Sequence, residues 1–146
     1  REELDEWTPG EHNGTFRGNN HAFVTAAAAL EEFWKDDNFA KSVREKGEII
    51  AKRMQKITKR YSEHNLFVKG RGMMIGISCA NGEVAAEICQ HAFKNGLVIE
   101  TSGNHSQVVK CLCPLTITHE QINQAMDILD DAFAAVLPSQ AANKVS

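Results

Sequence analysis

From Leu66 onward, short apolar segments alternate with segments of helical periodicity, and this alternation limits the available folds more than any other feature of the chain. The string LFVKGRGMMIGISC predicts two short extended pieces around Gly70 and Gly72, of which the second, 73–79, is apolar enough for a buried strand. Two further strands are expected at 97–101 and 108–113, with helical stripes at 84–92 and 122–136. The order strand, helix, strand, strand, helix predicts a compact two-layer α/β domain.

The first 65 residues predict a loop and two helices, with no strands to pair with the later ones. Asn19 or Asn20 can cap the first helix, in which apolar residues recur at spacings of four, three and four from Phe23 to Trp34. A second amphipathic helix is expected from about Phe39 to Tyr61. The chain therefore begins with helices and continues into the α/β domain.

Local stop and start signals mark the later helices. Asn95-Gly96 is the usual left-handed end of a helix, and Thr118-x-x-Gln121 is a capping box that predicts the start of the last one. The polar residues 138–146 predict a flexible tail.

Composition excludes several classes of protein. A chain of 146 residues with 42% hydrophobic and 24% charged residues can close one ordinary globular core, or part of a larger one. A net charge of -3 gives no general attraction to nucleic acid or anionic membranes, and no apolar run is long enough to cross a bilayer. We therefore expect a soluble, cytoplasmic protein whose four cysteines are reduced thiols.

Several cysteine, histidine and basic residues are candidates for metal or nucleic-acid sites, but their patterns do not predict one. Cys111 and Cys113 lie on one face of a strand but supply only two ligands, so no metal site is expected. The six histidines are scattered along the chain. The second helix is markedly basic, but interleaved acids favour a solvated helix face over a nucleic-acid surface.

The loop before the first helix offers a more specific pattern. Gly14 and Gly18 let the backbone approach a ligand closely, Thr15 offers a hydroxyl, and the helix N-terminus that follows favours an anion. The pattern is neither a Walker loop nor a dinucleotide fingerprint. From these residues alone, an anion site and a plain loop with an Asn cap both stay open.

A resemblance to a known family adds to this pattern. The string HNGTFRGNN resembles the loop His-Gly-x-Thr-Phe-x-Gly-Asn that follows the catalytic lysine of class III pyridoxal-phosphate aminotransferases. The strings PGEHNGTFRGNNHAFVTAAAAL, GRGMMIGI and ETSGNHSQVVKCLCPLTIT extend the similarity from Trp7 to about Phe133. Where this chain has KCLCPLTIT, ornithine and 4-aminobutyrate transaminases of the class tend to have an Arg and an Ala-Pro-Pro-like run.

The resemblance implies the C-terminal part of a fold-type I transferase. Residues 1–37 would be the end of the large cofactor-binding domain with its interface loop and connecting helix, 38–137 the small C-terminal α/β domain, and 138–146 a flexible tail. The lysine that carries pyridoxal 5'-phosphate would lie upstream of Arg1, so this chain alone is expected to be inactive. In the class the active site is shared within a homodimer or higher homo-oligomer, which implies that Thr15, with Gly14, contacts the cofactor phosphate of the neighbouring subunit.

The resemblance also implies a substrate contact at Lys110. Members of the class usually have an arginine near this point that binds the carboxylate of the amino or keto acid, and a lysine can offer only a point charge. Arg17 is the other candidate for this contact, and an edge-strand lysine facing water is the simple alternative. Two other functions stay open: a different ω-aminotransferase of the class, or a non-catalytic small-molecule-binding domain that begins at Leu66.

Overall fold

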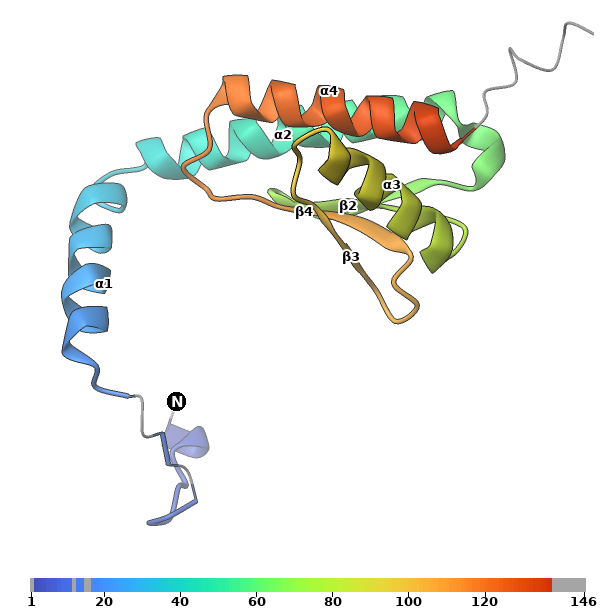
Figure 1. Cartoon of the computed structure of the whole chain (residues 1–146). Coiled ribbons are helices and arrows are strands. Elements are labelled where there is room, and N and C mark those ends of the chain that lie inside the picture. Colours follow the sequence, from blue (N-terminus) through green and yellow to red (C-terminus); the bar gives the residue numbers. More distant parts are fainter. Residues whose placement is uncertain (1, 12, 15–16, 138–146) are drawn as a thin grey trace, which may run out of the picture. The chain divides into compact units, whose positions relative to one another are not determined.

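The computed structural model describes residues 2–11, 13–14 and 17–137. The chain divides into two compact units, Arg1–Phe39 and Ala40–Ser146 (Figure 1). The first unit contains a short 3-10 helix, η1 (Glu2–Leu4), and helix α1 (Asn20–Phe33). The second unit holds nearly all of helix α2 and the elements after it, in the order α2 (Asn38–Arg60), η2 (Ser62–His64), β1 (Phe67–Arg71), β2 (Met74–Ser78), α3 (Gly82–Lys94), β3 (Glu100–Ser102), β4 (Val108–Leu112) and α4 (His119–Val136).

The four strands form one antiparallel sheet in the order β1-β2-β4-β3. The predicted α/β class is confirmed, and so is the order strand, helix, strand, strand, helix from Met74 onward. The first of the two extended pieces, β1, is also a strand and pairs along its whole length with β2. β2 and β4 are therefore the inner strands, with β1 and β3 at the edges.

One strand begins later than the sequence predicts. The apolar run from Leu97 is not paired until Glu100, because its first residue completes the end of α3. The backbone N–H of Leu97 donates to the carbonyl of Ala92, and that of Gly96, at φ +90°, donates to the carbonyl of Phe93. These two hydrogen bonds form the Schellman motif that the Asn95-Gly96 pair predicts. Because the motif uses Leu97, the strand starts later than expected.

The predicted helix starts are confirmed in the structure. The Asn19 side chain accepts a hydrogen bond from the Ala22 N–H at 3.1 Å and caps α1. At α4, the Gln121 N–H donates to Thr118 Oγ1 at 3.1 Å, and the Thr118 N–H donates to Gln121 Oε1 at 3.0 Å. Each cap satisfies backbone donors that have no partner within the helix.

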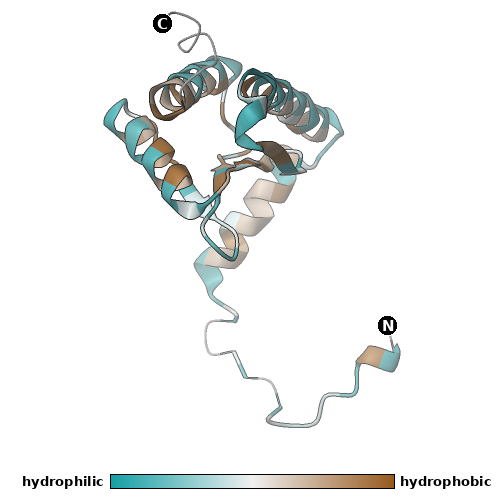
Figure 2. Ribbon diagram, turned by 90° about the vertical axis from the view of Figure 1, so that its right-hand side faces the viewer, coloured by the Kyte–Doolittle hydropathy of each residue, from teal (hydrophilic) through white to brown (hydrophobic). Residues whose placement is uncertain are grey.

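The core of the second unit lies between the helices and one face of the sheet. Helices α2, α3 and α4 cover this face, with their hydrophobic sides turned inward (Figure 2). Burying each large apolar side chain stabilises the fold by about 1.5–3 kcal/mol. The largest fully buried side chains come from all three helices and from the two inner strands: Ile50, Met54, Ile57, Ile77, Ile88, Val109, Ile122, Leu129 and Phe133.

Helix α2 is less uniformly solvated than its charge pattern suggests. Arg60 binds both carboxylate oxygens of Asp130 on α4, at 2.7 and 3.1 Å, and this ion pair raises the pKa of the guanidinium. Lys46 is buried, and its Nζ donates to the Leu115 carbonyl at 3.0 Å in the loop between β4 and α4. The interpretation of a solvated basic face is therefore wrong for Lys46, which fixes that loop.

Candidate functional site

Lys110 lies on the face of the sheet that the helices leave open. Its neighbours on β4, Val109 and Cys111, point into the core, so the alternation of a strand turns Lys110 to the opposite face. Its Nζ lies 2.7 Å from Oε1 of Glu100 on β3, and the Lys110 side chain is 25% exposed. The alternative of an edge-strand lysine facing water is wrong in two respects, because β4 is an inner strand and the Lys110 ammonium group is paired with Glu100.

The strand register places Lys110 in a row of four residues that crosses the sheet. Lys69 on β1 is opposite Gly76 on β2, Gly76 is opposite Lys110, and Lys110 is opposite Glu100. We call these residues the outer-face row. Strands are spaced about 4.8 Å apart, so the two lysines flank Gly76 at about 10 Å between backbones. The two lysines of the row can attract a carboxylate by their charge, with Glu100 as a competing anion.

Gly76 is required by the close approach of β4. A Cβ at this position would lie 2.5 Å from the Val109 carbonyl oxygen and 3.2 Å from the Lys110 Cα. The same Cβ would lie 2.8 Å from Val108 Cγ1, so the glycine allows the two inner strands to lie close together. The sequence analysis missed Lys69, Gly76 and Glu100, because period-2 alternation shows which residues share a face of one strand but not which residues of other strands lie beside them.

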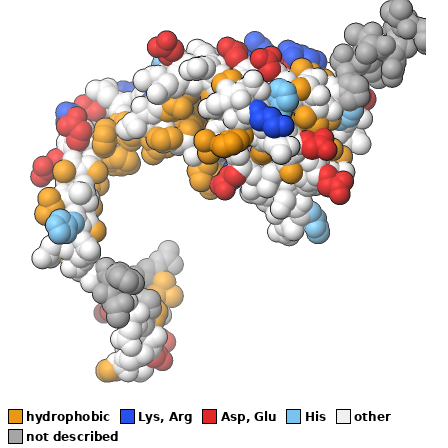
Figure 3. Space-filling model, in the orientation of Figure 1, with side chains coloured by type: hydrophobic (Ala, Val, Ile, Leu, Met, Phe, Trp, Pro, Cys, Tyr) orange, Lys and Arg blue, Asp and Glu red, His pale blue; other side chains and the backbone are white. Residues whose placement is uncertain are grey.

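Exposed apolar side chains lie on both sides of the outer-face row. Met74 and Leu112 are directly opposite each other on β2 and β4 and are 60% and 61% exposed. Phe67, at the start of β1, is 55% exposed. In the space-filling view, hydrophobic side chains gather on the lower side of this unit, along β4 and the loop that follows it (Figure 3).

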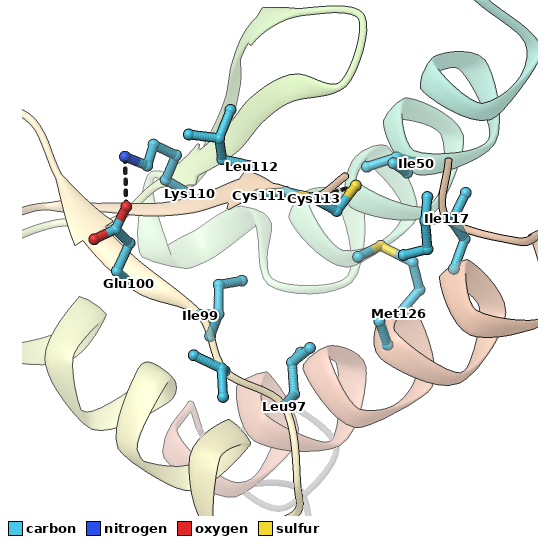
Figure 4. A pocket seen from close by; sticks show the side chains of 13 residues that line it. Ile50, Leu97, Ile99, Glu100, Lys110, Cys111, Leu112, Cys113, Ile117 and Met126 are labelled. Carbon is cyan, nitrogen blue, oxygen red and sulfur yellow. Dashed lines mark hydrogen bonds and ion pairs between the residues drawn. The ribbon is translucent and has the colours of Figure 1, made fainter. Parts of the chain in front are cut away.

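A pocket of about 290 Å³ opens beside the Lys110–Glu100 pair. Its walls come from the segment before β3, the end of β4, the loop after β4, and helices α2 and α4. Ile99, Ile117 and Met126 are among its apolar side chains, and Cys111 and Cys113 lie in its wall (Figure 4). We call this cavity the β4 pocket. Burial raises the pKa of the Cys111 thiol to about 12, with a further contribution from Cys113, so this thiol is protonated at neutral pH.

The predicted cofactor loop is described in part. Thr15 lies outside the described residues. The Arg17 N–H donates to the Gly14 carbonyl at 3.0 Å, and a Cβ at Gly14 would lie 2.7 Å from Arg17 Nε. The arginine side chain thus lies against Gly14. Gly18 follows at φ +80° and leads into the Asn19 cap.

Two classes of site have no support in the described part of the chain. Among residues 2–11, 13–14 and 17–137, no three His, Cys, Asp or Glu side chains are grouped so that they could hold a metal ion. None of the helices described there is both long enough and apolar enough to cross a membrane.

Comparison with known proteins decides the family. Residues 1–133 match the protein family described as Aminotransferase class-III. The chain belongs to the class-III aminotransferase family. It is 47% identical over 134 residues to the diaminobutyrate–2-oxoglutarate transaminase of Vibrio parahaemolyticus, an alignment that covers 92% of this chain and 32% of the relative. The enzyme of the same name from Halomonas elongata is 50% identical over 132 residues, with 89% of this chain and 31% of the relative covered.

Solved structures of aminotransferases share the fold of this class-III chain. The lysine aminotransferase of M. tuberculosis superposes with a TM-score of 0.76 at 20% identity, over 89% of this chain and 29% of that protein. The chain therefore spans about a third of the length of the relatives that it matches.

Proposed function

We propose that this chain is the C-terminal part of a pyridoxal-phosphate-dependent transaminase of the class-III family. The full-length enzyme would convert L-2,4-diaminobutyrate and 2-oxoglutarate into L-aspartate 4-semialdehyde and L-glutamate, as in ectoine biosynthesis. The observation that carries this proposal is the 47–50% identity, over about nine-tenths of the chain, to two transaminases named for these substrates. A different ω-amino donor, as in ornithine or 4-aminobutyrate transaminases, is the second candidate.

Lys110 is proposed to bind the substrate carboxylate. The structure supports this role through position and charge, since the ammonium group lies on the face of the sheet that the helices leave open and the Lys110 side chain is partly exposed. A lysine attracts a carboxylate as a point charge without the planar fork of an arginine. Glu100 already holds the ammonium at 2.7 Å, so a substrate carboxylate must compete with Glu100 or join it.

Gly14 and Thr15 are proposed to contact the cofactor phosphate across a homodimer or higher homo-oligomer. The fit rests on Gly14, where the missing Cβ leaves room for the Arg17 side chain to lie across the loop. A guanidinium near Gly14 would support the binding of a phosphate dianion there, because charge-assisted hydrogen bonds to phosphate are strong. Arg17 is also the second candidate for the substrate carboxylate. When bound, pyridoxal phosphate supplies the electron sink for amino transfer.

The proposal is tested with the protein made together with the coding sequence upstream of Arg1. Purified protein would be mixed with 2-oxoglutarate and either L-2,4-diaminobutyrate, ornithine or 4-aminobutyrate, and glutamate would be measured with and without added pyridoxal phosphate. We expect cofactor-dependent glutamate formation with the highest kcat/KM for diaminobutyrate. A higher value for either other donor would favour the second candidate. The 146-residue chain is the control and is expected to form no glutamate.

A further inference from the structure

Two thiols in the wall of the β4 pocket form a pair that the transaminase reaction does not use. Cys111 Sγ lies 3.9 Å from Cys113 Sγ, and both cysteines are free. Cys111 lies on β4 and Cys113 directly follows that strand, and both line the β4 pocket. We propose that Cys111 and Cys113 form a dithiol site that binds one trivalent arsenical, with its organic substituent in the β4 pocket.

The spacing of the pair favours a bridging atom over a direct disulfide. The two sulfurs are 3.9 Å apart, so they would have to move about 2 Å closer to form a sulfur–sulfur bond of about 2.0 Å. An arsenic atom inserted between the sulfurs needs a much smaller movement, because it forms one bond to each sulfur.

The chemistry of the adduct suits an apolar wall. An arsine oxide, R–As=O, reacts with two thiols to give R–As(SR')2 and one water. Two As–S bonds form, the arsenic–oxygen bond breaks, and both thiol protons leave with the oxygen. The oxidation state of arsenic does not change, so no oxidant is needed. The product is neutral, so no uncompensated charge is buried among Ile99, Ile117 and Met126.

Access sets the order of attack. Cys113 is only partly buried, whereas Cys111 is buried and its thiol pKa is raised to about 12, so Cys113 reacts first. The second bond then closes within one molecule, which gives a high effective concentration of the second thiol. The other two cysteines, Cys79 and Cys89, are both buried and do not line the β4 pocket.

The test uses the reduced 146-residue chain and phenylarsine oxide. After one equivalent is added, excess glutathione removes arsenic held by single thiols, and the intact mass reports what is retained. Trypsin cleavage after Lys94 and Lys110 then separates residues 72–94, with Cys79 and Cys89, from residues 111–144, with Cys111 and Cys113. We expect one phenylarsenic group per chain, on residues 111–144, that dimercaptopropanol removes.

Matched variants distinguish the dithiol site from other reactions. Cys113→Ser and Cys113→Ala change a partly buried residue, and their folding is checked by circular dichroism. Each is expected to lose the group at least tenfold faster in glutathione. The double variant C79S/C89S is expected to retain it like the wild type. Retention by either Cys113 variant, a label on residues 72–94, or loss from the wild type as fast as from Cys113→Ser would overturn the proposal.

The role of the pocket is tested by changing the substituent. Methylarsine oxide makes the same two As–S bonds but buries little apolar area. If the ring occupies the β4 pocket, the phenyl adduct should outlast the methyl adduct in dimercaptopropanol on the wild-type chain. Equal lifetimes would contradict the placement of the substituent in the pocket.

Discussion

Replacing Gly76 by alanine tests the close contact between the two inner strands. The added Cβ would lie 2.5 Å from the Val109 carbonyl oxygen, 2.8 Å from Val108 Cγ1 and 3.2 Å from the Lys110 Cα. Two of these atoms belong to the backbone of β4, so a rotamer change cannot remove the clash. The strands must instead separate by several tenths of an ångström along a ladder that is paired from Met74 to Ser78.

The expected cost follows from these distances. Overpacking of this kind costs about 1–3 kcal/mol, and alanine recovers about 0.4–1 kcal/mol by restricting the unfolded chain. We therefore expect Gly76→Ala to lower the free energy of unfolding by about 1 kcal/mol. For a unit of this size, that corresponds to a fall in Tm of about 4–8 °C.

The assay is urea and thermal unfolding followed by far-ultraviolet circular dichroism, because both tryptophans lie in the first unit and do not report on the sheet. Lys69→Ala is the matched control, since this exposed residue is the register partner of Gly76 on β1. It should change stability by less than about 0.5 kcal/mol. A Gly76→Ala protein as stable as the wild type would refute the close approach of the strands.

Three further perturbations have defined outcomes. Glu100→Gln removes an ion pair whose carboxylate is 69% exposed, so urea unfolding should show a loss below about 1 kcal/mol, and a larger loss would contradict a weak surface pair. Thr118→Ala removes the capping box of α4 and should cost about 1 kcal/mol in the same assay, whereas no change would mean that the cap is redundant. Burial raises the pKa of Cys79 to about 11, so its thiol is protonated at pH 8 and its alkylation by iodoacetamide should accelerate as the pH rises toward 11; a rate that levels off near pH 9 would contradict the shift.

Local signals predicted the helices well. The Asn19 cap, the Asn95-Gly96 stop and the capping box at Thr118 each depend on a few adjacent residues, and all three occur in the structure. The start of β3 was predicted too early, because Leu97 has the character of a strand residue but its N–H completes the end of α3.

The candidate site was only partly predictable, because it depends on pairings between distant segments. The resemblance drew attention to Lys110, but its partner Glu100 and its neighbour Gly76 follow from the strand register. Lys46 was placed among solvated charges because its helix is basic, yet the packing of α2 against the loop after β4 buries it. The proposed roles of Gly14, Thr15 and Arg17 stay predictions.

The most direct test is the steady-state KM for 2-oxoglutarate of the full-length transaminase with Lys110→Met and Lys110→Arg. A hydrogen bond to a charged group contributes about 1.5–3 kcal/mol, which corresponds to a factor of about 10–100 in binding. We predict that Lys110→Met raises KM by at least tenfold, whereas Lys110→Arg, which keeps the charge, stays within about threefold of the wild type. An unchanged KM in Lys110→Met, with cofactor binding and kcat retained, would contradict the assignment of Lys110 to the substrate carboxylate.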